Sequence, residues 1–396
     1  MKNTFQTAVV CALTVLLLSL SAIAQNPIIR TKFTADPCAL VVDNTVYVYT
    51  GHDEASTTAT DYVMNNWHVA SSKDMVNWTD HGQRLSLTNF TWANAAAFAS
   101  HVVPRNGKFY WYTCVLQKPQ LGYGPYFGIG VAVADNPLGP FIDALGKPLI
   151  RDNQTSDLQF DIDPCVFIDT DGQAYMYWGN ATNGGPLKMV KLKANMTEID
   201  GAITTVNVPA FTEAPYLHKR NNIYYLSYAS GWPETIAYAT SNSPLGPWTA
   251  RGTLNGRVSS ETNHQSIIDF KGQWYFVYHN AGLPTGGNFR RSVCIDYLYY
   301  NADGTIKKIV QTTTGVKPVT ITGLEGSSEG EKSNLSHLDT DSEAILEYEV
   351  YDFMGKKIKD GTDTKPKIVS SLPEGGSYII RIKNTDMSGS FKIVKY

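Results

Sequence analysis

The chain has 396 residues, 17% of them charged and 12% aromatic, with a formal net charge of −3. This length exceeds one ordinary domain. The lack of a basic excess argues against a nucleic-acid-binding surface.

The first 24 residues have the composition of a leader. Lys2 precedes an apolar stretch over residues 8–20, and small residues lead up to Ala24. This pattern predicts a secretory signal peptide over residues 1–24, with cleavage before Gln25. The apolar stretch is too short for a membrane span, so we predict none. A lipoprotein would carry a cysteine at the cleavage point, where Gln25 stands.

One pattern then recurs five times along residues 25–322. Each copy has a short apolar run, a turn and an alternating strand rich in aromatic residues. The aromatic strands begin at Val46, Phe109, Ala174, Ile223 and Trp274. Such repeats cannot bury their faces alone, and no long segment has a helical period. The sequence therefore predicts an all-β, five-bladed β-propeller over residues 25–322.

Alignment of the five copies brings one residue from each to an equivalent position at the start of its blade. The first strand of every propeller blade lines the central axis, so these residues should converge at one mouth. Three of the five are carboxylic acids. The residues are Asp36, Ala99, Asp163, Glu213 and His264.

Four cysteines remain once the leader, with Cys11, is removed: Cys38, Cys114, Cys165 and Cys294. Cys38 and Cys165 occupy equivalent positions in non-adjacent blades, so we expect buried free thiols rather than disulfides. The sequence has no Cys-x-x-Cys or His/Cys ligand spacing, which argues against a structural zinc site.

The composition changes after the fifth copy. Residues 323–342 are rich in Gly, Ser, Glu, Asp and Asn, which is typical of a linker. Alternation resumes over residues 343–396 and predicts a small C-terminal β-sandwich. This segment has no cluster of acids or histidines of catalytic appearance.

Two carboxyl groups facing each other across a pocket are what glycosidic bond cleavage requires. Asp36 and Glu213 come from the first and fourth blades, nearly opposite in a ring of five, and a wide separation favours inversion. Asp163 would add a negative charge that raises the pKa of a neighbouring acid. A single Asp-Pro step can also be only a turn or cap, so the hypothesis depends on the shared register.

Other acids and the histidine leave alternatives open. Asp161, Glu234 and Glu261 are rival acids that fall outside the register. His264 could hold water or a hard cation at the axis, although a single histidine is more often structural and does not make a strong metal site.

Several longer motifs carry a family resemblance. They are Asp-Pro at Asp36, the run from Asp161 to Asn180, Glu-Ala-Pro-Tyr-Leu at Glu213, Asn-His at His264 and Phe-Arg-Arg-Ser-Val-Cys around Arg291. Together they resemble the family 43 glycoside hydrolases over about residues 26–316.

This resemblance implies an inverting, exo-acting enzyme with Asp36 as general base and Glu213 as general acid. Asp163 would tune the pKa and orientation of that acid. The resemblance also implies that His264 contacts a central calcium ion or its waters. Arg291 would reach the sugar pocket.

We also expect sugar contacts from Asn180, from Phe98 and from loop aromatics. The family's usual Trp-Ala-Pro phrase in blade two reads Phe98, Ala99, Ser100 here, so the apolar wall departs from the family pattern. Trp92, Trp67 and Trp232 are candidates for stacking on a sugar, with core packing as the alternative for each.

Phrases from Pro233, Asn263 and Phe289 are similar to those of arabinoxylan-debranching members. They favour removal of α-L-arabinofuranosyl residues from plant hemicellulose such as arabinoxylan. A β-xylosidase of the same fold is the alternative. Two other classes remain open: a carbohydrate-binding propeller without catalysis, and a surface scaffold.

The tail resembles the C-terminal sorting domain of the type IX secretion system through Val-Tyr-Asp-Phe-Met-Gly-Lys-Lys and Gly-Gly-Ser-Tyr-Ile-Ile-Arg-Ile. This implies contact with secretion machinery and a secreted or cell-surface location. The alternative is an accessory sandwich on a periplasmic protein.

Overall fold

The computed structural model describes residues 25–124, 126–154, 160–180, 186–316, 345–352, 357–364, 376–382 and 389–395. The predicted signal peptide and the predicted linker at 323–342 lie outside the described residues. The chain divides into two compact units, Met1–Pro318 and Val319–Tyr396. Within the described parts, three short 3-10 turns are the only helical elements, and no helix could cross a membrane.

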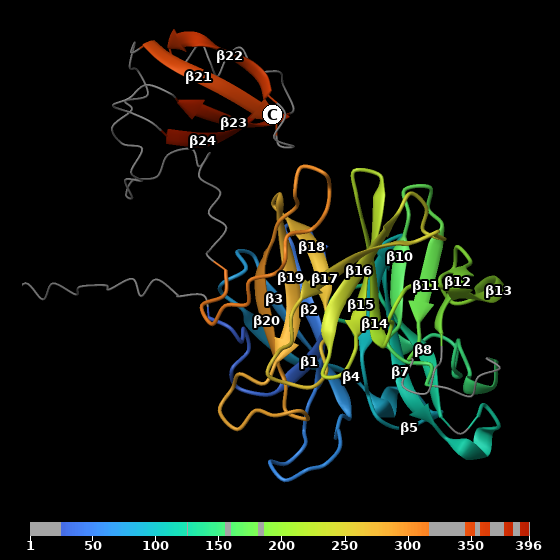
Figure 1. Cartoon of the computed structure of the whole chain (residues 1–396). Coiled ribbons are helices and arrows are strands. Elements are labelled where there is room, and N and C mark those ends of the chain that lie inside the picture. Colours follow the sequence, from blue (N-terminus) through green and yellow to red (C-terminus); the bar gives the residue numbers. More distant parts are fainter. Residues whose placement is uncertain are drawn as a thin grey trace, which may run out of the picture. The chain divides into compact units, whose positions relative to one another are not determined.

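The first unit is a ring of five antiparallel sheets (Figure 1). The predicted all-β, five-bladed propeller is confirmed. Blade one contains β1 (Thr34–Val42), β2 (Thr45–His52), β3 (Asn66–Ser72) and β4 (Thr79–Ser86). Blade two contains β5 (Ala93–Ala95), β6 (Ser100–Arg105), β7 (Lys108–Gln117), β8 (Phe127–Ala134) and β9 (Ile142–Asp143).

Blade three contains β10 (Cys165–Ile168), β11 (Ala174–Trp178), β12 (Leu187–Leu192) and β13 (Ile199–Val206). Blade four contains β14 (Glu213–Arg220), β15 (Ile223–Ser230), β16 (Thr235–Ser241) and β17 (Thr249–Asn255). Blade five contains β18 (Ser266–Phe270), β19 (Gln273–Asn280) and β20 (Ser292–Leu298).

The N-terminal segment lies along blade five. The backbone amides of Ile28 and Thr34 donate to the carbonyls of Val293 and Arg291, both at 2.9 Å. These bonds satisfy backbone groups beside β20, which would otherwise be exposed at a sheet edge. The first and last blades are therefore joined by backbone hydrogen bonds as well as by packing.

A closed circuit of hydrogen bonds also joins the inner strands. In four of the five blade contacts, a side chain accepts the backbone amide of a neighbouring blade. The pairs are Cys38 Sγ with Val102, His101 Nδ1 with Val166, Cys165 Sγ with Leu217, and Ser266 Oγ with Ala39. At the fifth contact the hydroxyl of Tyr216 donates to the carbonyl of Ile267 at 3.0 Å. This circuit fixes the inner strands against one another.

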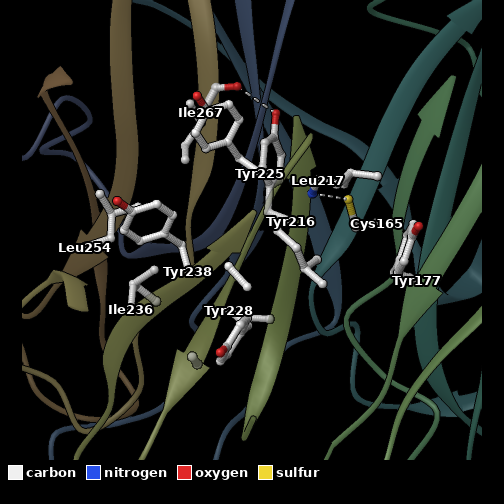
Figure 2. Packing of buried hydrophobic residues seen from close by; sticks show 14 of the residues in the cluster. Cys165, Tyr177, Tyr216, Leu217, Tyr225, Tyr228, Ile236, Tyr238, Leu254 and Ile267 are labelled. Atoms are coloured by element: carbon white, nitrogen blue, oxygen red, sulfur yellow. Dashed lines mark hydrogen bonds between the residues drawn. The ribbon is translucent and has the colours of Figure 1, made fainter. Parts of the chain in front are cut away.

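Aromatic and aliphatic side chains fill the space between blades. Figure 2 shows the cluster shared by blades three, four and five, in which Tyr216 and Leu217 make two of the circuit's bonds. All four described cysteines are free and buried, as predicted. They act as small apolar residues of the core.

The second unit contains β21 (Ile345–Asp352), β22 (Lys357–Thr364), β23 (Gly376–Ile382) and β24 (Gly389–Lys395). These form one antiparallel sheet in the order β22-β21-β23-β24. The predicted β-structure is present. The second layer that a β-sandwich requires does not occur among the described residues of this unit.

Candidate active site

One pocket of about 380 Å³ gathers residues from all five blades. All five equivalent register positions line it, so the inner-strand alignment places them together. The pocket also contains Asn180, Trp232, Arg291 and Phe98 from the sequence-based candidates. Its remaining residues are Asp61, Tyr62, Met64, Phe127, Phe160, Ile162, Thr262 and Asn263.

Unusual backbone geometry aims the acids into this pocket. Asp36 has φ 51° and Asp163 has φ 57°, in a region that residues with a Cβ seldom adopt. In β1 the register shifts between Ala35 and Cys38, and in β14 it shifts between Glu213 and Tyr216. Such bulges turn a side chain away from the direction of the regular pleat. The acids thus leave the strand faces and point toward the mouth.

Asp36 is held as an anion. Nη1 of Arg291 donates to its Oδ1 at 2.8 Å, and its own backbone amide donates to Nδ1 of His279 at 3.2 Å. Burial, the largest single effect, would raise the pKa of Asp36, but the Arg291 charge together with His279 and His264 outweighs it and holds that pKa well below its ordinary value. An ionised carboxylate is the form that a general base requires.

Arg291 is itself fixed from behind. Its Nε and Nη2 donate to both oxygens of Asp53 at 2.9 Å, and its guanidinium lies over the Tyr62 ring at 4.6 Å from the centroid. The two parallel hydrogen bonds set the plane of the guanidinium. Sequence reasoning placed Arg291 in the sugar pocket and missed Asp53. The side chain does line the pocket, but its donors are directed at Asp36 and Asp53.

Glu213 has the opposite character. Burial, together with the negative charge of Asp36, raises its pKa to about 7. Nδ2 of Asn180 donates to Oε2 of Glu213 at 2.5 Å, which holds the carboxyl in one orientation. Glu213 therefore keeps a proton close to neutral pH, as a general acid must.

Asp163 lies beside Glu213. Its Oδ2 accepts the backbone amide of Ala214 at 3.0 Å, so it contacts the bulge that carries the acid. Burial and the charge of Glu213 raise the pKa of Asp163 well above its ordinary value. The charge of Asp36 adds to this effect, so Asp163 binds its proton more tightly than an ordinary aspartate.

His264 faces two of the acids. Its Nδ1 lies 4.0 Å from Oδ1 of Asp36 and 3.7 Å from Oδ2 of Asp163. Burial lowers its pKa to about 4, so the imidazole is neutral at pH 7. A calcium ion prefers six to eight oxygen ligands. The described residues contain no group of three or more His, Cys, Asp or Glu side chains arranged for a metal. His264 thus offers one nitrogen donor to a cation at the axis.

Aromatic rings form one wall of the pocket. Phe98 stacks on Phe127 with centroids 5.1 Å apart, and Tyr62 meets Phe98 edge-on at 5.7 Å. Phe160 packs against Phe127 at 5.2 Å. Trp232, in the loop between β15 and β16, is 60% exposed and lines the mouth. Of these rings, sequence reasoning selected only Phe98 and Trp232.

The structure corrects two aromatic candidates. Trp92 is 1% exposed and lies outside the pocket; its Nε1 donates to Asp143 at 3.1 Å within blade two. The prediction that Trp92 contacts sugar is therefore wrong. Trp67 is fully buried, and its Nε1 donates to the carbonyl of Phe98 at 2.7 Å. It supports the aromatic wall from behind without reaching the cavity.

Two of the rival acids lie elsewhere. Asp161 is buried in an ion pair with Lys188 at 3.0 Å inside blade three. Glu261 does not line the pocket. Glu234 also lies outside the pocket lining but is fully buried next to Glu213.

A sequence model of the family described as "Glycosyl hydrolases family 43" matches residues 24–306, which include every acid of the site. The chain belongs to glycosyl hydrolase family 43. The resemblance predicted from the sequence motifs is confirmed.

Individual members of the family are similar over most of the propeller. An arabinoxylan arabinofuranohydrolase of Bacillus subtilis (strain 168) is 32% identical over 74% of this chain. The match spans 66% of that relative's length, just under two thirds. An α-L-arabinofuranosidase structure from Clostridium thermocellum is 38% identical, with TM-score 0.60 over 74% of this chain and 98% of that one.

A third similar protein has a name that covers both activities. It is a β-xylosidase/α-arabinofuranosidase from a compost microbial metagenome, solved with xylotriose in a calcium-free form. It is 31% identical, with TM-score 0.65 over 72% of this chain and 97% of that one. The family 43 relatives thus include enzymes named for arabinofuranose and for xylose.

Proposed function

We propose that this family 43 glycoside hydrolase is an inverting, exo-acting α-L-arabinofuranosidase that debranches plant hemicellulose such as arabinoxylan. The observation that carries the proposal is the opposite tuning of two carboxyls in one pocket. Asp36 is kept ionised by Arg291, whereas Glu213 keeps its proton to about pH 7. Two acids with separated pKa values are the signature of an acid and a base.

In the proposed reaction, Asp36 accepts a proton from a water molecule as that water attacks the anomeric carbon. The new carbon–oxygen bond forms on one face of the sugar while the glycosidic bond breaks on the other. Glu213 transfers its proton to the departing oxygen. Afterwards Asp36 holds a proton and Glu213 is ionised, and exchange with solvent restores both.

Asp163 acts on the acid without contacting the reacting atoms. Its carboxyl holds the amide of Ala214, next to Glu213, and its negative charge would disfavour ionisation of Glu213. Asn180 orients the same carboxyl through its amide. We propose that Phe98 and Trp232 contact the sugar, because both line the pocket.

A β-xylosidase is the second candidate. The compost relative, 31% identical, is named for both activities, and the rings of the pocket wall can stack on either sugar. A carbohydrate-binding propeller without catalysis is less well supported, because Asp36, Asp163 and Glu213 all line the pocket with shifted pKa values.

We further propose that the chain is exported. The support is the leader-like composition of residues 1–24 and the resemblance of the tail to type IX sorting domains. Its final location would be secreted or cell-surface. Mass spectrometry of the mature protein tests both ends of the chain. We expect an N-terminus at Gln25 and a tail that has been removed or modified. An intact Met1 would contradict the signal peptide, and an unaltered tail would contradict the sorting domain.

The test of the proposed function compares wild type with Glu213→Ala on aryl α-L-arabinofuranosides and aryl β-xylosides. Loss of the proton donor should slow substrates with poor leaving groups by several orders of magnitude and those with good leaving groups far less. NMR of the first-formed sugar should show the anomer opposite to the substrate. Inactivity of the wild type on both series, or retention of configuration, would refute the assignment.

A further inference from the structure

Glu234 is a buried acid that the proposed reaction does not use. It is fully buried and does not line the pocket. It sits in the loop after β15. In that strand, Ala229 pairs with Glu213 of β14 on one side and with Ile236 of β16 on the other. Strand pairing alone therefore brings this loop beside the general acid.

The backbone holds Glu234 in one position. Its amide donates to the carbonyl of Glu261 at 2.8 Å, and its Oε2 accepts the amide of Asn263 at 2.7 Å. The other carboxyl oxygen, Oε1, is buried without a conventional hydrogen-bond partner. A buried acceptor left without a donor destabilises the folded state, so the surroundings of Oε1 require explanation.

The group within hydrogen-bonding range of Glu234 is the carboxyl of Glu213. Two carboxylates offer only acceptors, so a bond between them requires a proton on one. Glu213 opens to the pocket and accepts from Asn180, whereas Glu234 has no solvent contact. The other titratable groups that face Glu234, Asp163 and Asp36, are acids as well, and a negative charge on either disfavours ionisation of Glu234. The proton is therefore best placed on Glu234.

We propose that Glu234 is a positioning residue for the general acid: its protonated carboxyl donates a hydrogen bond through Oε1 to Glu213, orients it, and stabilises the anion left after proton transfer. The raised pKa of Glu234, caused by burial and by the Glu213 charge, agrees with this state. With Asn180, Glu234 gives the Glu213 carboxylate two side-chain donors. The inference rests on the proposed role of Glu213 as acid.

Two variants separate this role from a structural one. Glu234→Gln keeps an acceptor for Asn263 and an N–H donor for Glu213, whereas Glu234→Leu keeps similar bulk and removes both. Hydrogen bonds to charged groups contribute about 1.5–3 kcal/mol, which corresponds to a roughly 10- to 150-fold rate effect. We expect Glu234→Leu to lose that factor in kcat/KM on aryl glycosides with poor leaving groups and much less on good ones.

The pH profile provides an independent kinetic readout. Loss of a donor to the ionised form raises the pKa of Glu213, so the alkaline limb of kcat/KM should move to higher pH in Glu234→Leu. Glu234→Gln should keep the wild-type position of this limb and most of the rate. Glu261→Gln, a neighbouring acid outside the pocket, is the matched control and should match wild type.

Infrared difference spectroscopy tests the proton itself without activity. At pH 7 the wild type should show a protonated carboxyl band that is lost in Glu234→Gln. Absence of that band difference, equal slowing of both leaving-group classes, or a Gln variant as slow as Leu would overturn the inference. An inactive wild type would refute the proposed function instead, and the infrared result would still decide the protonation of Glu234.

Discussion

Arg291 and Asp36 form a buried ion pair, with Nη1 2.8 Å from Oδ1, although 255 positions separate them in the chain. Asp36 opens the first blade, and Arg291 precedes β20 of the fifth. The blade ring must close before the two side chains can meet. Closure of the propeller and ionisation of the proposed base are therefore coupled.

Replacement of Arg291 by Met should disable the base. Without the guanidinium, burial raises the pKa of Asp36, so the acidic limb of kcat/KM should move to higher pH and the rate at that limb should fall. Asp53 would also lose its partner, and breaking a buried ion pair typically costs about 3–5 kcal/mol. A pH–rate profile together with thermal unfolding measures both effects.

Arg290→Met is the matched control, since Arg290 packs over Phe33 and bonds the carbonyl of Ala55 instead of an acid. It should leave the acidic limb in place. An Arg291→Met profile that overlays the wild type would contradict the coupling of Arg291 to Asp36.

Ionisation of the proposed acid, Glu213, should reduce the stability of the folded state at neutral pH. The pKa of Glu213 rises from 4.5 to about 7 on folding, so the folded state binds this proton more tightly. Proton binding at Glu213 therefore makes its full contribution to folded-state stability below pH 4.5. This contribution is lost as the pH rises through about 7. Glu213→Gln, which never ionises, should have a Tm advantage over wild type that grows between those limits.

The alkaline limb of kcat/KM should fall in the same region, because the ionised acid cannot donate. Glu198→Gln is the control for the Tm series, since Glu198 is an exposed partner of Lys193 and exposed pairs contribute little. A Glu213→Gln advantage that does not change with pH would show that Glu213 does not titrate in this range.

The site was predictable in part because a propeller converts repeat register into spatial proximity. Asp36, Asp163 and Glu213 were chosen by register alone, and they line one pocket. Local backbone geometry was not predictable: the positive φ of Asp36 and Asp163 requires the surrounding sheet to enforce it. Asp53 carries no register signal, because its role depends on Arg291, 238 positions away.

The burial of individual aromatic residues was equally unpredictable from the sequence. Trp92 and Trp232 look alike as tryptophans at loop-like positions, yet they are 1% and 60% exposed. Trp92 becomes core because Phe90 and Gly130 pack against it. Glu234 was set aside for its register, since the hairpin that returns it to Glu213 becomes evident only once β15 and β16 are paired.

Trp232→Ala therefore tests whether Trp232 contacts the substrate at the mouth of the pocket. Loss of an exposed stacking platform should raise KM for oligosaccharides roughly 2- to 10-fold and leave kcat on small aryl glycosides unchanged. Trp92→Phe is the contrasting variant: it loses the bond to Asp143 and should lower Tm without affecting KM. The sugar-contact role of Trp232 would be refuted by unchanged KM values across an oligosaccharide series.

Removal of the tail should leave the chemistry intact. The acids and their supporting residues belong to the unit Met1–Pro318, whereas β21 to β24 belong to Val319–Tyr396. A chain ending at Thr322 should hydrolyse a small aryl glycoside at close to the full-length rate and unfold with a similar Tm. Because β21 to β24 pair only with one another in the described sheet, no blade should lose a strand. A truncated enzyme that folds normally but has lost its rate would show that the tail contributes to the site.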